Sequence, residues 1–328
     1  MIMHISILIP AGHTSLVNIA GTHQIFNQVN GFLTGQGKEP LFQVELVGLS
    51  IPTEQTNGLF SVNPTRIFSD IEKTDLIILP AIHDEPGKID ESNKAFIPWI
   101  IKHYEAGAEI ASLCVAAFFL ASTGLLNGKR CSTHWIHAGN FRKIYPDVHL
   151  VDDKILTEDS GIYTSGGAYS FLNLLLYLIE KYAGRELALL TAKTFMIDID
   201  KASQSPFIIF EGQKDHDDQP VKKAQEFIEN NFEEKISVDQ LAAMFALSRR
   251  TLERRFKSAT SNTISEYVHR VKVEAAKRSL EATHKNVNDV MFEVGYNDSK
   301  AFRSTFKKVT GMSPVDYKKK FNKLVAAI

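Results

Sequence analysis

The spacing of hydrophobic residues near the C-terminus predicts two short helices joined by a turn. Hydrophobic side chains from Val287 to Val294 recur with the i, i+3, i+4, i+7 spacing of one buried helix face. Gly295 interrupts this pattern, and Asp298 is a candidate N-cap residue for a second helix. The inward positions of the second helix are predicted to be Ala301, Phe302, Thr305, Phe306 and Val309. We expect Gly311 and Pro314 to close it.

The outward face of the second predicted helix is polar and basic. Its exposed side chains are expected to be Ser299, Lys300, Arg303, Ser304, Lys307 and Lys308. Two short helices that meet at a glycine turn, the second with a basic outer face, are typical of a helix-turn-helix that places its second helix in the DNA major groove. An ordinary pair of helices with a solvated basic face would show the same pattern. A single copy therefore leaves both interpretations open.

The same pattern occurs about 50 residues earlier, which weakens coincidence as an explanation. Ser237 and Gln240 have the spacing of a capping box, which would start a helix over 238–245. A turn at Leu247 and Ser248 is followed by a predicted helix over 249–258. Its inward side chains are Leu252, Phe256 and Ala259. Its outward side chains are Arg249, Arg250, Glu253 and Arg254, with Arg255 and Lys257 placed more laterally. A long helix over 264–280 is predicted to join the two copies.

Strand and helix patterns alternate through the first 210 residues. Short hydrophobic runs predict strands over 3–9, 42–49, 75–80, 109–113 and 162–167. Helical patterns lie between and after them, over 19–29, 93–106, 168–182 and 186–196. Strands that alternate with helices favour a doubly wound, flavodoxin-like α/β domain, followed here by an all-α domain. Binding sites in such α/β domains form at the carboxyl ends of the parallel strands.

Length and charge both divide the chain into two domains. A chain of 328 residues is long enough to form two domains. The polar, aperiodic stretch 211–220 ends in a proline and is predicted to link a domain at 1–210 to one at 221–328. From Val221 onward, 21 Lys and Arg stand against 13 Asp and Glu, a balance of +8. The remaining 16 basic and 25 acidic residues give the preceding part a balance of −9. The asymmetry favours a polyanion-binding module, although a charge split can also be incidental.

Several other classes of protein do not fit the composition. No run of about 18 uncharged hydrophobic residues is present, so a membrane span is not expected. The hydrophobic N-terminus lacks a basic region and a cleavage site, and it is predicted to be a buried strand. Two cysteines, Cys114 and Cys131, make no disulfide framework, and no Cys/His cluster has zinc spacing. We therefore expect a protein of the reducing cytoplasm without a metal or a cofactor.

The candidate chemistry of the first domain lies around Cys114. A predicted strand ends at Leu113, and a helix of small and hydrophobic residues follows the cysteine directly. This resembles a nucleophile elbow, in which the dipole of the following helix lowers the pKa of the thiol. His134 is a candidate base for a Cys–His pair. The alternative is a buried structural cysteine and a histidine that hydrogen-bonds locally.

A second small-residue turn is expected at the same edge of the sheet. Ser165, Gly166 and Gly167 follow the strand that begins at Ile162. Backbone amides at such a turn can bind an anion, but small residues there can equally allow close packing of helix and strand. As a hypothesis, Cys114, His134 and Ser165 to Gly167 line a ligand pocket, because all of them lie at strand ends on one edge.

Residues 221–320 resemble an AraC-type DNA-binding domain. The matching pieces are SVDQLAA from Ser237, SRRTLERRF from Ser248, VGYNDSKAFRSTFKK from Val294 and TGMSPVDY from Thr310. These pieces extend over the whole domain. One departure is Met291, where the family usually has alanine, and the flexible methionine side chain is compatible with a repacked core.

Residues 1–210 resemble the PfpI/ThiJ-like, glutamine-amidotransferase-like domain that is fused to this module in GlxA-type regulators. The matching pieces are DLIILP from Asp75, ASLC from Ala111, ASTGLLNGK from Ala121, THW from Thr133 and TSGG from Thr164. Three departures bear on activity. Val115 to Ala117 replace a region where glycine is frequent, Ala81 follows Pro80 in place of glycine, and Asn18 stands where aspartate is frequent. Bulkier groups around Cys114 would narrow the space for a substrate.

The combined resemblance implies a transcriptional regulator. Its N-terminal domain would form a homodimer and sense a small metabolite in a pocket that is no longer catalytic. Members of the family often respond to nitrogen-containing metabolites such as amino acids or betaines. Double-stranded DNA is the implied partner of the C-terminal domain, and RNA polymerase is left open as another.

The resemblance also places base-reading positions on the two outward faces. They are Arg250, Glu253 and Arg254 in the first copy, and Ser299, Lys300 and Ser304, with Arg303 nearby, in the second. Arginine can pair with guanine and glutamate with cytosine, whereas serine is better suited to contacts with the DNA backbone. We therefore expect Ser248 to Lys257 to carry most of the sequence discrimination.

Two alternatives remain at this point. The chain could be a cysteine-dependent hydrolase or lyase that uses Cys114 and His134, with DNA binding as an accessory property. It could also be an architectural DNA protein, whose affinity would not change with a ligand.

Overall fold

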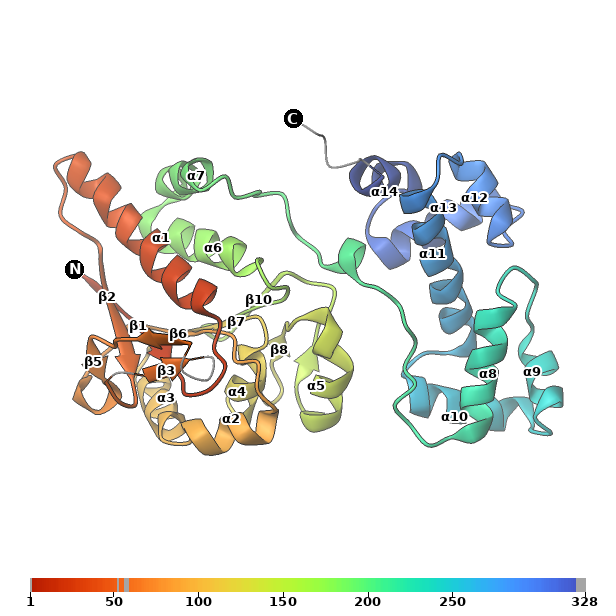
Figure 1. Cartoon of the computed structure of the whole chain (residues 1–328), viewed down its shortest axis with the longest axis horizontal. Helices are drawn as coiled ribbons and strands as arrows, with labels where there is room; N and C mark the ends of the chain where they lie inside the picture. The colour runs from red at the N-terminus through yellow and green to blue at the C-terminus, as the bar shows by residue number, and fades with distance from the viewer. Residues whose placement is uncertain (1, 52, 56–58, 323–328) are drawn as a thin grey trace. The chain divides into compact units, whose positions relative to one another are not determined.

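A seven-stranded sheet lies at the centre of the first 204 residues (Figure 1). The strands are β1 (Met3–Ile9), β2 (Phe42–Gly48), β5 (Arg66–Ile67), β6 (Leu76–Leu79), β7 (Glu109–Leu113), β10 (Leu156–Asp159) and β11 (Ile162–Ser165). Their order is β10-β11-β7-β6-β1-β2-β5, and only β10 pairs antiparallel with its neighbour in this described sheet. The order β2-β1-β6-β7-β11 is the 2-1-3-4-5 arrangement of flavodoxin-like folds, so the predicted fold class is confirmed.

Helices cover both faces of this sheet, as the alternating strand and helix patterns predict (Figure 1). On one face lie α1 (Leu16–Gly35), α6 (Phe171–Ala183) and α7 (Arg185–Thr194), and on the other α2 (Pro86–Asn93), α3 (Phe96–Glu105), α4 (Ala116–Ser122) and α5 (Ala138–Ile144). Successive strand residues point to opposite faces. Ile5 and Ile7 therefore join the cluster with α1 and α6, and Leu8 joins the cluster with α3 and α4.

The computed structural model describes residues 2–51, 53–55 and 59–322. Several of its elements are only two or three residues long, too short for a periodic pattern to predict. They are β3 (Thr53–Gln55), β4 (Phe60–Val62), β8 (Arg130–Cys131), β9 (His149–Leu150), η1 (Phe68–Asp70), η2 (Trp135–His137) and η3 (Ser205–Phe207). None of the helices in the described ranges is long and apolar enough to cross a membrane.

The second unit of the chain is helical and begins at Ser205. Its helices are α8 (Gln219–Asn230), α9 (Val238–Met244), α10 (Arg249–Thr260), α11 (Ile264–Ala282), α12 (Val287–Glu293), α13 (Ser299–Thr310) and α14 (Pro314–Phe321). The boundary predicted at 210 lies inside this unit. The segment 211–220, predicted to be a linker, makes contacts with it, because Asp218 accepts hydrogen bonds from Arg255 and Gln225 donates to the carbonyl oxygen of Gln213.

Two hydrophobic clusters in the helical unit repeat one another. The first contains Leu252, Phe256 and Tyr267, and the second contains Phe302, Phe306 and Tyr317, each 50 residues further along the chain. All six side chains are fully buried. The recurring hydrophobic pattern of the sequence therefore corresponds to two similar cores along α11.

Two details of the second copy differ from the prediction. α13 ends at Thr310 with Gly311 as its C-cap, as predicted, but Pro314 starts a further helix that was not predicted. It occupies the first turn of α14, where its missing N–H and fixed φ are favourable. That helix buries Tyr317 in the second core. Ala301 was predicted to face inward and is exposed, because Phe302 and Phe306 already fill the inward side of α13.

Candidate nucleic-acid interface and effector site

The first helix-turn-helix consists of α9 and α10, joined by a short turn. Ala246 in this turn has a φ of 52°, the left-handed region that non-glycine residues rarely adopt. Ser248 then caps α10 by accepting a hydrogen bond from the backbone N–H of Thr251 at 3.2 Å. Leu252 and Phe256 anchor the inner face in the first core, so the opposite face points to solvent.

The predicted base-reading side chains of α10 lie on that solvent face. Arg250, Glu253, Arg254 and Lys257 are all exposed. Within the described part of the chain, Arg250, Arg254 and Lys257 form no side-chain hydrogen bond or ion pair. Three basic groups on one helical face, without internal partners, leave their charge available to an external polyanion.

The other two arginines of α10 have partners of their own. Arg249 pairs with Asp239 at 3.3 Å and with Glu253 at 3.1 Å. Arg255 donates two hydrogen bonds to the carboxylate of Asp218, which is the N-cap residue of α8. The Arg255 guanidinium thereby holds the pKa of that carboxyl below its usual value. Arg255 ties α10 to α8, and Arg249 orients Glu253.

The second helix-turn-helix consists of α12 and α13 and offers fewer free arginines. Lys300, Ser304 and Lys307 are exposed and form no side-chain hydrogen bond or ion pair with the described residues. Arg303 donates from Nε to the hydroxyl of Ser299 at 3.2 Å, and Ser299 is half-buried. Arg250 and Arg254 correspond to Lys300 and Ser304 at the 50-residue offset.

Lys272 of α11 joins the two helix-turn-helix copies. Its Nζ is 3.1 Å from the carbonyl oxygen of Val294, 3.3 Å from that of Gly295 and 3.4 Å from that of Glu234. The first two carbonyls end α12, whereas Glu234 precedes α9. The ammonium is buried, which lowers the pKa of Lys272. One cation therefore holds segments of both copies against the long helix.

The α/β unit places Cys114 at a sharp turn between β7 and α4. Cys114 has a φ of 57°, a strained value that matches the elbow predicted from sequence. Its backbone N–H donates to Ser165 Oγ at 3.3 Å, so the ends of β7 and β11 meet as predicted. The pKa of the thiol nevertheless favours the alternative of a buried structural cysteine. Burial raises the pKa of Cys114 to about 11, against a smaller lowering by a hydrogen bond with Val115.

His134 lies beside this edge without forming a catalytic pair. Among the described residues, no hydrogen bond joins its imidazole to the Cys114 thiol. Its Nδ1 accepts from the backbone N–H of Ile136 at 3.3 Å, which is a local capping role. Burial, together with nearby His137 and His83, lowers the pKa of His134. The contacts fit the structural interpretation of Cys114 and His134 better than the catalytic one.

The side chain of Gln204, which no sequence pattern singled out, packs against the Gly166–Gly167 turn. A Cβ on Gly166 would stand 2.0 Å from Nε2 of Gln204 and 2.6 Å from the carbonyl oxygen of Thr133. Glycine is therefore required for Gln204 to approach, and Gly166 donates its own N–H to Ile155 at 2.9 Å. Gly167 has a φ of 91°. No local pattern predicts this contact, because Gln204 follows β11 by 39 residues in an aperiodic stretch.

Comparison with known proteins agrees with both halves of this description. Residues 36–181 match the DJ-1/PfpI family, and residues 241–320 match a helix-turn-helix domain. The chain joins a DJ-1/PfpI domain to an AraC-type helix-turn-helix domain.

Relatives of this DJ-1/PfpI and helix-turn-helix chain include two regulators of Pseudomonas aeruginosa. The HTH-type transcriptional regulator GbdR is 27% identical over 64% of this chain and 57% of its own length. The HTH-type transcriptional regulator ArgR is 27% identical over 64% of this chain and 64% of its own length. The matched stretch thus spans less than two thirds of either relative.

The DJ-1/PfpI fold also has a solved counterpart. The crystal structure of Drosophila melanogaster DJ-1beta aligns with a TM-score of 0.51 and 18% identity, covering 60% of this chain and 100% of that one. At this identity the likeness concerns the fold alone. The roles of Cys114 and the surrounding residues therefore rest on their contacts in this chain.

Proposed function

We propose that the chain is a sequence-specific DNA-binding transcriptional regulator controlled by a small metabolite. The observation that carries the proposal is the exposed face of α10. Arg250 and Arg254 stand there without partners among the described residues, while neighbouring Arg249 and Arg255 are held in ion pairs. A helix-turn-helix presents this face to the edges of base pairs in the major groove.

The two helix-turn-helix copies would have different roles in DNA recognition. Arg250 and Arg254 can each pair with guanine, and Glu253, oriented by Arg249, can accept a hydrogen bond from cytosine. On α13, the exposed polar and basic side chains suit contacts with DNA phosphates; they are Lys300, Arg303, Ser304 and Lys307. We therefore assign most of the base discrimination to the first copy and anchoring to the second. Lys272 would keep the distance between them constant.

The DJ-1/PfpI domain is proposed as a non-catalytic effector domain. The protonated, buried thiol of Cys114 and the missing Cys–His contact argue against hydrolase or lyase chemistry. The edge formed by Cys114, His134 and Ser165 is the proposed effector site, with Gly166 and Gly167 beneath Gln204. Homodimers through this domain and a contact with RNA polymerase complete the proposal.

Selection from random-sequence DNA tests the proposed function. The full chain, immobilised and washed at about 0.15 M salt, should enrich a motif with two unequal halves, the stronger one containing guanine. The double variant Arg250→Ala/Arg254→Ala should lose the stronger half. If the wild-type chain enriches no motif although it binds bulk DNA, the protein is architectural and the proposal fails.

A further inference from the structure

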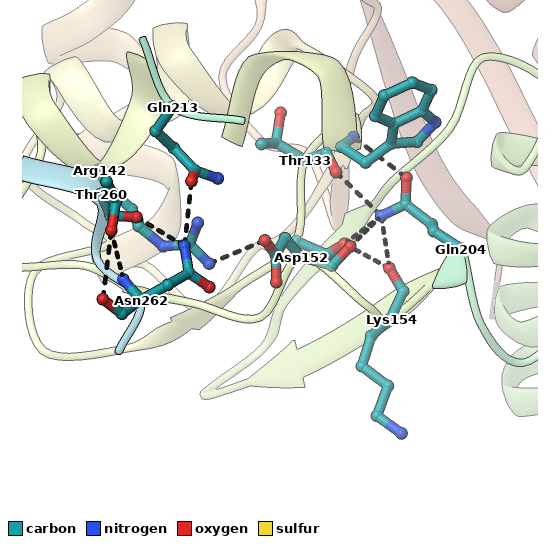
Figure 2. A network of polar contacts seen from close by, with 10 residues as sticks. Thr133, Arg142, Asp152, Lys154, Gln204, Gln213, Thr260 and Asn262 are labelled. Carbon is teal, nitrogen blue, oxygen red and sulfur yellow. Dashed lines mark hydrogen bonds and ion pairs between the residues drawn. The ribbon is translucent and has the colours of Figure 1, made fainter. Parts of the chain in front are cut away.

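The side chain of Gln204 is held in a cradle of backbone oxygens (Figure 2). Its Nε2 lies 2.9 Å from the carbonyl oxygen of Lys154, 3.0 Å from that of Thr133 and 3.2 Å from that of Asp152. The hydroxyl of Ser132 is 3.4 Å away. On the other side, the backbone N–H of Trp135 donates to Oε1 at 3.3 Å. Gln204 is 3% exposed, so these hydrogen bonds hold its carboxamide inside the α/β unit.

This cradle adjoins the proposed effector site. Thr133, whose carbonyl receives Gln204, also donates from Oγ1 to the carbonyl oxygen of Cys114 at 3.2 Å. Gly166 lies directly beneath the carboxamide. A molecule that binds at this edge and shifts Thr133 or Gly166 would therefore alter the hydrogen bonds of Gln204.

Gln204 is also the last residue of the α/β unit, and contacts with the helical unit follow within a few residues, beginning with Phe207 against Phe321. Four residues after Gln204, the carbonyl oxygen of Ile208 accepts from Lys277 Nζ at 2.5 Å. The N–H of Phe210 donates to Glu274 at 3.1 Å. Lys277 and Glu274 form a nearly buried ion pair at 2.8 Å on α11, the helix that joins the two helix-turn-helix copies. Ion pairs this deep are costly unless their remaining hydrogen bonds are satisfied, and residues 208–210 satisfy them here.

We propose that residues 204–210 are a transmission link, whose N-terminal anchor in the cradle is coupled to its C-terminal anchor on α11. The inference rests on the proposed function for its purpose, since it names how an effector signal would leave the α/β unit. The coupling between the two anchors does not depend on whether the chain binds DNA. Release of the Gln204 carboxamide should weaken the hydrogen bonds at Ile208 and Phe210, and loosening these should weaken the cradle by the same factor.

Hydrogen exchange of the full chain tests the link. In Gln204→Glu, a carboxylate would face three carbonyl oxygens and leave the cradle. We expect the amide of Phe210 to exchange at least about tenfold faster. The matched control is Gln24→Glu, on the exposed face of α1, which should leave this amide unchanged. Faster exchange confined to residues 150–166, with Phe210 unchanged, would mean that Gln204 only braces the α/β unit and would overturn the link.

A second variant tests the same coupling from the α11 end of the link. Glu274→Leu/Lys277→Met removes both anchors on α11 without leaving a buried charge unpaired. The link predicts faster exchange at Gln204, whose N–H donates to Asp153 at 2.8 Å. Unchanged exchange there would refute the coupling even if Gln204→Glu fails to fold. DNA affinity, measured separately by fluorescence anisotropy, distinguishes the two proposals, since a chain that binds no DNA motif can still show the coupled exchange.

Discussion

Arg255 donates two hydrogen bonds to the carboxylate of Asp218, at 2.7 and 2.8 Å. The same carboxylate accepts from the backbone N–H of Val221 and caps α8. Sequence spacing placed Arg255 to the side of the outward face that carries Arg254, but it could not predict the partner of Arg255. The contact assigns Arg255 to the stability of the helical unit, while Arg254 remains available on the exposed face.

Asp218→Ala should therefore destabilise the helical unit and leave base preference unchanged. Loss of an acidic N-cap costs about 1 kcal/mol at pH 7. Arg255 lowers the pKa of Asp218 in the folded state, so its contribution is present above the unfolded pKa of about 3.9 and is lost as the pH falls through the folded value. Urea unfolding of variant and wild type at pH 7 and at about pH 3 should show the difference shrink. An equal difference at both values would exclude the ion pair as its cause.

Arg254→Ala should weaken DNA binding by roughly 1–3 kcal/mol and relax discrimination at one base pair. The Arg254 side chain has no partner in the part of the chain that the structure describes, so folding should be unaffected. A gel-shift titration with the selected site and its single-base variants measures both effects. Arg185→Ala in the α/β unit, an exposed arginine paired with Glu180, is the matched control. An unchanged binding curve and base preference would remove Arg254 from the reading face.

Gly295→Ala should destabilise the helical unit by about 3 kcal/mol or more. Gly295 has a φ of 73°, and an added Cβ would stand 1.9 Å from the carbonyl oxygen of Glu233. The shift would also disturb Lys272, which holds both copies. Gly311→Ala has nearly the same φ, 74°, but its Cβ would approach nothing closer than 3.8 Å. This control should cost only about 1 kcal/mol in thermal unfolding. Equal losses would show that the close approach to Glu233 does not matter.

The thiol of Cys114 should behave as an inert, protonated group. Burial raises its pKa to about 11, so labelling by iodoacetamide should stay slow at pH 7–9 and rise only toward pH 11. Cys114→Ser should leave DNA affinity unchanged in the absence of an effector. Rapid labelling that reaches a plateau below pH 8 would reveal an activated nucleophile and revive the enzyme alternative.

Regular patterns in the sequence were enough to predict the main architecture. The period between three and four in α10 and α13 reflects burial on one face, and the short hydrophobic run of β6 reflects burial on both faces of the sheet. The ends of β7 and β11 met as predicted because parallel strands share their carboxyl edge. Pro314 was misread, since proline both ends helices and starts them.

Such patterns could not predict the contacts of individual side chains. Gln204 reaches the Gly166 turn from an aperiodic stretch, and Arg255 finds Asp218 across 37 residues. The pKa of Cys114 depends on how closely Val115 and its neighbours pack, which sequence spacing does not encode. Topology thus predicted which strand ends meet at this edge of the sheet, whereas the position of Gln204 and the burial of Cys114 depend on the packing of the folded chain.

Base-resolution footprinting of the full chain on its selected site tests the central claim most directly. Two copies held on α11 by Lys272 should protect two patches on one face of the duplex, about one helical turn apart. Arg254→Ala should weaken protection in one patch and preserve the other. A continuous footprint that follows no sequence, or one whose two patches respond equally to this substitution, would contradict the account.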